Sequence, residues 1–259
     1  MDLGLKGRKA IVCASSRGLG RACATALAED GVDVVINGRD AAVVASTAEA
    51  IAAATGVTAT PVVADLDTEA GRAKLLEACA EPDILVNNNG GPPPGGFRDW
   101  QREEWDAGIT ANMMTPIELI KVCVDGMIER RFGRIVNVTS VAVRMPFPGL
   151  AMSSAARSGL TGFVASLSRE VAPYNVAVNN LQPGLFETDR LAVGMKGAAE
   201  ARQQDVETVR AGMLANIPAG RFGVPDEFGR ACAFLCSAHA GFITGQNLLL
   251  DGGHFPGAF

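Results

Sequence analysis

The sequence predicts an α/β fold in which a doubly wound parallel sheet carries helices on both faces. Short apolar runs alternate with helical stretches along the chain, which implies right-handed crossovers between parallel strands. The apolar runs are nearly continuous, as in strands that are buried on both faces. A chain of 259 residues, 48% of them hydrophobic, can bury such a core as a single domain over 1–259.

The elements follow one another as this fold requires. The first strand, 9–13, leads into a helix over 18–30 that ends at Gly31. The second strand, 32–36, leads into an alanine-rich helix over 40–54 that contains no proline. Further strands are expected at 60–64, 83–87, 134–138, 176–181 and 247–250. Further helices are expected at 69–80, 101–130, 154–172 and 226–236.

A long insertion, 186–217, separates the strand at 176–181 from the last helix. Its length predicts a lid that closes over a substrate and excludes water. The insertion mixes basic and acidic side chains, so its charge does not identify a substrate. They are Arg190, Lys196, Arg202 and Arg210 against Glu200, Asp205 and Glu207.

Composition excludes several classes of protein. A net charge of -5 and a pI near 5.2 argue against a nucleic-acid-binding protein, which would carry a basic face. The apolar runs are too short for a membrane span, and the first residues lack the apolar stretch of a signal peptide. The six cysteines lack the spacing of a disulfide scaffold or a zinc site. We therefore expect a cytoplasmic protein without a metal that acts on a small molecule.

A glycine-containing turn stands between the first strand and the first helix. Gly18 and Gly20 let the backbone approach a pyrophosphate at the helix N-terminus, where free amides and the helix dipole favour negative charge. Such a pair also occurs in ordinary helix entries, and its place after the first strand favours a dinucleotide site. The cofactor contacts expected here are Ser15, Ser16, Arg17, Gly18, Leu19 and Gly20.

The end of the second strand indicates which dinucleotide is bound. A ribose with a free 2′-hydroxyl usually meets an acidic residue at this point. The sequence has Asn37 and Gly38 instead, and both Arg39 and Arg17 could bind a 2′-phosphate. We expect cofactor contacts from Asn37 and Arg39, and NADP(H) to be favoured over NAD(H). Asp40 weakens that preference.

Further motifs follow in order along nearly the whole chain. They are Asp65-Leu66, Asn87-Asn88-Asn89-Gly90, Asn112, 135–140, 180–184 with Thr188, 221–227 and 243–253. With the glycine turn, they resemble the short-chain dehydrogenase/reductase family, in its single-domain form similar to 3-oxoacyl reductases. The resemblance implies a Rossmann-type fold and an oxidoreductase. It adds the cofactor contacts Asp65, Leu66, Asn88, Asn89, Gly90, Pro183, Gly184 and Thr188.

Two positions near the cofactor depart from the family pattern. Asn89 replaces an alanine, and Ala14 replaces the first glycine of the turn. A methyl group at position 14 is tolerable if the backbone there does not need a positive φ.

The larger departure concerns the catalytic residues. The resemblance implies that Asn112 and Ser140 are catalytic, and that a tyrosine and a lysine follow Ser140 by 13 and 17 residues. The tyrosine transfers a proton, and the lysine lowers its pKa and holds the nicotinamide ribose. Here these positions hold Ser153 and Arg157, which i, i+4 spacing places on one helix face. The single tyrosine, Tyr174, lies beyond the helix, too far away to replace the missing one.

Three functions remain open. The first is an NADP(H)-dependent oxidoreductase that uses Ser140, Ser153 and Arg157 in an altered proton route. It could act on a small carbonyl or alcohol, or on a conjugated C=C bond. The second is a redox-neutral isomerase or lyase that uses the bound nucleotide structurally. The third is a catalytically silent nucleotide-binding protein.

Two loops suggest where a substrate could lie. Phe97 in loop 90–100 and Met145 could form an apolar wall, or pack beneath the loops. Arg144 could face an acidic substrate or lie free on the surface. The resemblance also implies a homotetramer that pairs through the helices at 101–130 and 154–172.

Overall fold

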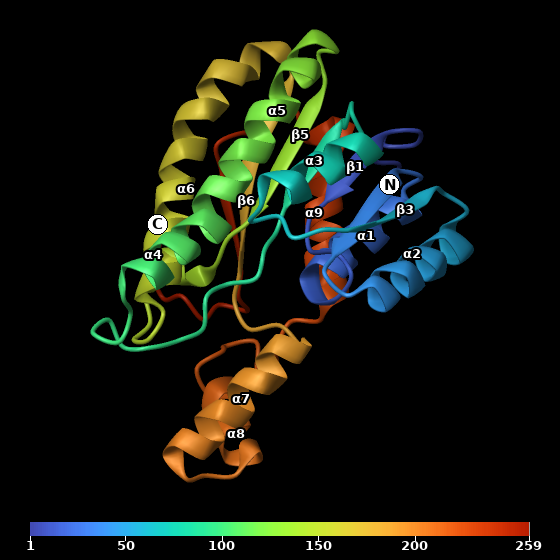
Figure 1. The fold of residues 1–259 in the computed structure, drawn as a ribbon. Helices are drawn as coiled ribbons and strands as arrows, with labels where there is room; N and C mark the ends of the chain where they lie inside the picture. The colour runs from blue at the N-terminus through green and yellow to red at the C-terminus, as the bar shows by residue number, and fades with distance from the viewer. Residues whose placement is uncertain (259) are drawn as a thin grey trace.

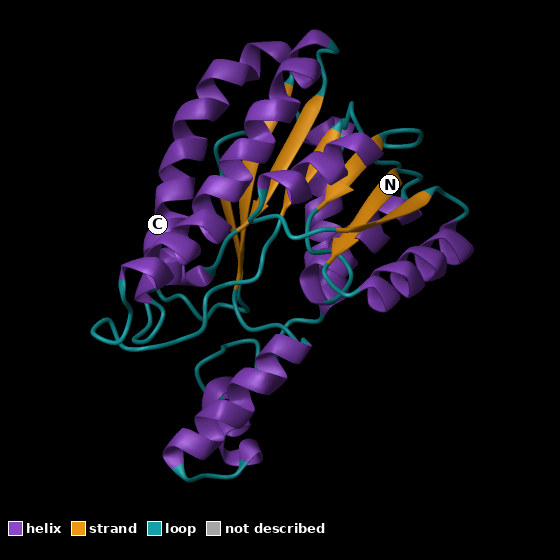
Figure 2. Cartoon of the chain, in the orientation of Figure 1, coloured by secondary structure: helices purple, strands orange, loops and turns teal. Residues whose placement is uncertain are grey.

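The computed structural model describes residues 1–258, which form one parallel sheet of seven strands (Figure 2). The strand order is β3-β2-β1-β4-β5-β6-β7. Because this order reverses between β1 and β4, a ligand cleft is expected where their carboxyl ends diverge. The predicted fold class is confirmed. The strands are β1 (Lys9–Val12), β2 (Asp33–Gly38), β3 (Ala59–Val63), β4 (Ile84–Asn87), β5 (Gly133–Val138), β6 (Val176–Pro183) and β7 (Asn247–Leu250).

Helices cover both faces of the sheet (Figure 1). One core cluster joins the sheet to α1 (Gly18–Glu29), α2 (Ala41–Thr55) and α9 (Pro225–Cys236). The other joins it to α3 (Glu69–Ala78), α5 (Thr115–Glu129) and α6 (Ala151–Val171). Within residues 1–258, none of the helices combines the length and apolar character of a membrane span.

The helix expected over 101–130 is interrupted, which corrects the sequence prediction. It divides into α4 (Arg102–Ile109), a π-helical turn η1 (Thr110–Met114) and α5. Pro116 explains part of the change, because it has no N–H to donate to the carbonyl four residues earlier. Such π-helical turns occur frequently at functional sites. Here the turn carries Asn112, one of the expected catalytic residues.

The insertion 186–217 folds as two helices that project beyond the carboxyl ends of the strands (Figure 1). They are α7 (Asp189–Arg202) and α8 (Val206–Leu214). Thr188 caps α7 by accepting a hydrogen bond from the Leu191 N–H. Asp205 caps α8 in the same way, from the Thr208 N–H. Phe186 and Gly223 form an isolated parallel bridge at the base of the insertion.

Ala14, directly after β1, adopts a φ of 44°. Alanine is tolerable here only if the backbone does not need a positive φ, and that condition fails. The turn requires this conformation because the Ala14 N–H donates to Asn37 Oδ1 and its carbonyl accepts from Asn88 Nδ2. The Ala14 backbone is therefore held in the left-handed region, where a residue with a Cβ atom is strained and glycine is favoured.

Replacing Ala14 with glycine should stabilise the protein. Removing the Cβ relieves the left-handed strain, and we expect the free energy of unfolding to rise by about 1 kcal/mol. Thermal unfolding should show the melting temperature rising by roughly 2–4 °C. Ala42→Gly, in the first turn of α2, is the control and should destabilise. Equal destabilisation by both variants would contradict this account of Ala14.

Candidate nucleotide and substrate site

The turn between β1 and α1 can cradle a phosphate. Gly18 has a φ of 56°, and a Cβ built on it would lie 3.7 Å from Thr188 Cγ2. The structure thus brings together two of the expected cofactor residues from distant parts of the chain. A Cβ on Gly20 would collide with the Ala14 carbonyl, so the close approach of turn and helix depends on glycine. This arrangement fits the pyrophosphate of a dinucleotide at the N-terminus of α1.

Ser15 and Asn37 shape the turn from within. Ser15 is fully buried, and its hydroxyl donates to the Val12 carbonyl and accepts from the Asn37 N–H. Asn37 is also buried, and its amide nitrogen donates to the carbonyls of Val62 and Ala64. The expected cofactor contacts of Ser15 and Asn37 stay predictions. Their hydrogen bonds are satisfied inside the protein, where they hold the turn in place.

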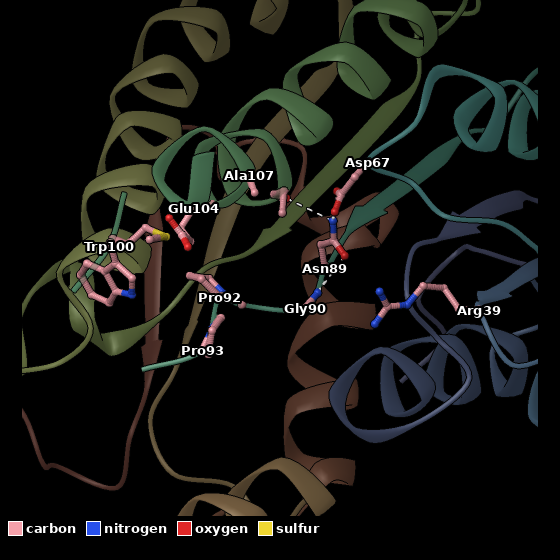
Figure 3. Close-up of a pocket in the computed structure, with 13 residues that line it drawn as sticks. Arg39, Asp67, Asn89, Gly90, Pro92, Pro93, Trp100, Glu104 and Ala107 are labelled. Atoms are coloured by element: carbon pink, nitrogen blue, oxygen red, sulfur yellow. Dashed lines mark hydrogen bonds between the residues drawn. The ribbon is translucent and has the colours of Figure 1, made fainter. Parts of the chain in front are cut away.

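A cavity of about 270 Å³ is lined by residues from the segments that follow β2, β3 and β4, and from α4, η1 and α6 (Figure 3). Arg39 marks one end and Trp100 lies toward the other, and Met152 is also among the lining residues. Within residues 1–258, no ion pair or hydrogen bond engages the Arg39 guanidinium. Arg17, by contrast, lies 3.6 Å from Asp40 Oδ2. Arg39 is therefore the cation better placed for the 2′-phosphate expected from the sequence.

Asn89 links three parts of the cavity wall. Its amide nitrogen donates to Asp67 Oδ1 at 2.8 Å and to the Ala111 carbonyl at 3.3 Å (Figure 3). Its amide oxygen accepts from the Gly90 N–H. An alanine could make none of these side-chain bonds, so this substitution ties β4 to the loop after β3 and to η1.

Leu66 contributes only its backbone to this region. Its side chain is buried, and its carbonyl accepts from Arg72 Nη1 and Thr115 Oγ1. Asp65, in contrast, is exposed, with one carboxylate oxygen accepting from the Asp67 N–H. The expected cofactor contacts of Leu66 and Asp65 both stay predictions, and the Asp65 carboxylate is exposed.

Three of the four expected catalytic residues follow β5 or lie on α6. Arg157 is buried on α6, and its Nη1 donates to the Val138 carbonyl at 2.6 Å, two residues before Ser140. Its Nε donates to Ser153 Oγ at 3.1 Å, which confirms that Ser153 and Arg157 share a helix face. Burial and the nearby positive charge of Arg190 lower the pKa of Arg157 to about 10.

Both serine hydroxyls accept a hydrogen bond from an N–H group. Ser140 Oγ accepts from the Ala142 N–H at 3.1 Å, and Ser153 Oγ accepts from Arg157 Nε. Neither hydroxyl donates to an acceptor within residues 1–258, so each keeps its hydrogen for a ligand. Two hydroxyl donors backed by a buried cation can stabilise negative charge on a substrate oxygen.

Asn112 lies beneath the cavity. Its amide nitrogen donates to the carbonyls of Gly90 and Gly108, both at 3.4 Å. Its amide oxygen is buried and has no partner in the described part of the chain. Gly90 and Gly108 both line the cavity, so Asn112 supports its floor.

Two residues expected to contact substrate, Arg144 and Phe97, make contacts within the protein. Arg144 Nε donates to Gln182 Oε1 and its Nη2 to the Asn247 carbonyl, which ties the loop after β5 to β6 and β7. Phe97 is 62% exposed, lies outside the cavity lining and carries Arg98 over its ring. Both substrate assignments stay predictions. Met145 is half-buried and stays a prediction.

Tyr174 does not replace the missing tyrosine. It lies in the short helical turn after α6 and is 40% exposed. Lys196 is exposed on α7 and does not line the cavity. The substituted catalytic positions thus remain Ser153 and Arg157.

The family model described as "Enoyl-(Acyl carrier protein) reductase" matches residues 13–254. The chain is 35% identical to the 3-oxoacyl-[acyl-carrier-protein] reductase FabG of Vibrio harveyi over 254 residues, which cover 98% of this chain and 99% of the relative. The chain belongs to the short-chain dehydrogenase/reductase family.

Solved structures with this short-chain dehydrogenase/reductase fold superimpose on nearly the whole chain. L-sorbose reductase from Gluconobacter frateurii, complexed with NADPH and L-sorbose, has a TM-score of 0.93, 27% identity and 98% coverage of both chains. YwfH, an NADPH-dependent reductase involved in bacilysin biosynthesis, has a TM-score of 0.91 and 29% identity. The alignment covers 96% of this chain and 99% of YwfH. Both neighbours are described with NADPH, the form of cofactor that the sequence predicted for this chain.

Sequence reasoning missed several residues of this short-chain dehydrogenase/reductase cavity. Glu104 and Met152 line it, and Asp67 is held at its edge by Asn89. Met152 could have been predicted to lie near the site, because it directly precedes Ser153 in the sequence. Glu104 and Asp67 carried no such signal, because the packing of α4 and the path of the loop after β3 bring them to the cavity.

Proposed function

We propose that the chain is an NADP(H)-dependent reductase that stabilises negative charge on a substrate oxygen without protonating it. When bound, NADPH supplies a hydride. The proposal rests chiefly on two hydroxyls, since both Ser140 and Ser153 accept from N–H groups and can donate to a ligand. The exposed Arg39 guanidinium and the glycine turn support NADP(H) as the cofactor.

A conjugated C=C bond suits this site better than an isolated carbonyl. Hydride addition to an isolated carbonyl leaves an alkoxide, which needs a proton from a positioned acid. Arg157 keeps its proton up to about its pKa of 10, and a serine hydroxyl is a weaker acid than a tyrosine. Hydride addition to a conjugated C=C bond instead places charge on an enolate oxygen, which Ser140 and Ser153 can bind. Water then protonates the carbon, and the net reaction consumes one proton.

Matched pairs of enones and saturated ketones test the proposal, with cyclohexenone and cyclohexanone as the first pair. We expect NADPH absorbance to fall with cyclohexenone, and cyclohexanone to be the product identified by mass spectrometry. Cyclohexanol as the main product would instead support carbonyl reduction. Conversion without net cofactor change would support the redox-neutral function. Tight NADPH binding without conversion over a panel of such pairs would support the silent nucleotide-binding protein.

A further inference from the structure

Arg190 lies in the first turn of α7, and its side chain reaches the loop after β4. Its Nη1 makes a long contact of 3.5 Å to the Gly91 carbonyl. A Cβ built on Gly91 would lie 2.8 Å from Arg190 Nη2. Gly91 lines the cavity, together with Pro92 and Met152. The projecting insertion therefore places one guanidinium at the wall of the cavity.

The positive charge of Arg190 has no protein counter-ion among the described residues. No carboxylate lies within ion-pair distance of Arg190 or Arg157 in residues 1–258, although Glu187 and Asp189 are close to Arg190 in sequence. The two guanidinium groups are also close enough that Arg190 contributes to the lowered pKa of Arg157. Two neighbouring cations without an anion favour a ligand that carries one.

The acids at the cavity are engaged elsewhere. Asp67 Oδ1 accepts from Asn89 Nδ2 and from Thr115 Oγ1. Glu104 Oε2 accepts from the Gln101 N–H, as part of the cap of α4. In the described part of the chain, Arg190 is therefore an unpaired cation on the side of the cavity that Gly91 and Pro92 form.

We propose that Arg190 binds a carboxylate group of the substrate. This inference rests on the proposed reductase function and names its substrate class as a small conjugated carbonyl compound that carries a carboxylate. A guanidinium matches a carboxylate geometrically, with two parallel N–H donors. The competing partner for Arg190 is the cofactor pyrophosphate, because Thr188, two residues earlier, lies near Gly18 of the phosphate-binding turn.

Three variants isolate the contribution of Arg190. Arg190→Gln removes the charge while keeping a polar side chain. Gly91→Ala keeps the charge and displaces the guanidinium, because the new methyl group would lie 2.8 Å from Nη2. Lys196→Gln is the matched control, since it removes an exposed cation from the same helix outside the cavity lining.

Binding to the NADP⁺ complex is measured first, by calorimetry with levulinate and its neutral methyl ester. The wild-type protein should bind levulinate roughly 10- to 100-fold more tightly than methyl levulinate, as expected for a charge-assisted pair. Arg190→Gln should abolish this ratio, Gly91→Ala should reduce it and Lys196→Gln should preserve it. A wild-type ratio near one would overturn the inference. Loss of NADPH affinity in Arg190→Gln equal to its loss of levulinate affinity would also overturn it, by assigning Arg190 to the cofactor.

Turnover separates this inference from the proposed function. Acetylacrylate and its methyl ester each carry a conjugated C=C bond, and kcat/KM for NADPH consumption should favour the acid. Equal kcat/KM values for acid and ester would keep the reductase and overturn the carboxylate site. Arg190-dependent levulinate binding without any NADPH consumption would keep the carboxylate site and overturn the reductase.

Discussion

Ser140→Ala is expected to lower kcat for enone reduction by roughly 10²–10³-fold, with little change in NADPH affinity. The hydroxyl of Ser140 accepts from the Ala142 N–H, so its hydrogen can be donated to the substrate oxygen as charge develops there. Alanine removes that donor from the transition state but leaves the cofactor turn intact. Steady-state kinetics with cyclohexenone and fluorescence titration with NADPH measure the two quantities separately.

Ser154→Ala is the matched control for this prediction. Ser154 neighbours Ser153 on α6, but its hydroxyl is buried and has no partner in the described residues. Its loss should leave kcat within about twofold of wild type, in line with a site outside the reaction centre. An unchanged kcat in Ser140→Ala, or an equal fall in both variants, would remove Ser140 from the proposed mechanism.

Combining Ser153→Tyr with Arg157→Lys should create ordinary carbonyl reduction. The double variant restores the side chains that the family resemblance implies, on a helix face where Arg157 already contacts Ser153. A positioned general acid contributes roughly 10²–10⁴-fold in rate, so we expect a gain of that size in kcat/KM for cyclohexanone. Product analysis should identify cyclohexanol. A folded double variant that binds NADPH without this gain would show that more than two residues separate this site from a carbonyl reductase.

The pH dependence of the reaction should change with the same substitutions. In the wild-type protein, the charge of Arg157 is fully present below its pKa of about 10 and is lost as the pH rises through that value. Enone reduction should therefore stay level from neutral pH and fall only near pH 10. Carbonyl reduction by the double variant should fall at lower pH, because lysine depresses the tyrosine pKa below its usual value of ~10 and the proton is lost earlier. The single variant Arg157→Lys, which lacks the tyrosine, should not show this earlier fall.

The sequence predicted the order and type of nearly every element, because buried strands and amphipathic helices have distinct apolar patterns. It also predicted the contact of Ser153 with Arg157, since i, i+4 neighbours meet on any helix. The π-helical turn around Asn112 was not predicted, because it depends on how α4 and α5 meet the loop after β4. Local propensity contains no such tertiary information.

The internal hydrogen bonds of the polar side chains at the site were not predicted either. Ser15, Asn37 and Arg144 were expected to meet ligands because their polar groups lie near the carboxyl ends of strands. In the structure these side chains donate to backbone carbonyls or to a glutamine. Buried backbone polar groups need partners, and only the folded arrangement reveals which side chains provide them.

The internal bonds of Asn37 restrict how the cofactor preference could evolve or be engineered. A change from NADP(H) to NAD(H) commonly uses an acidic residue at the end of the second strand. An aspartate at position 37 would place a carboxylate against the carbonyls of Val62 and Ala64, where the amide nitrogen now donates. That exchange would weaken the turn that holds the pyrophosphate. A change of cofactor preference is therefore better made by substituting Gly38 and Arg39, because Asn37 is needed for its hydrogen bonds to Val62 and Ala64.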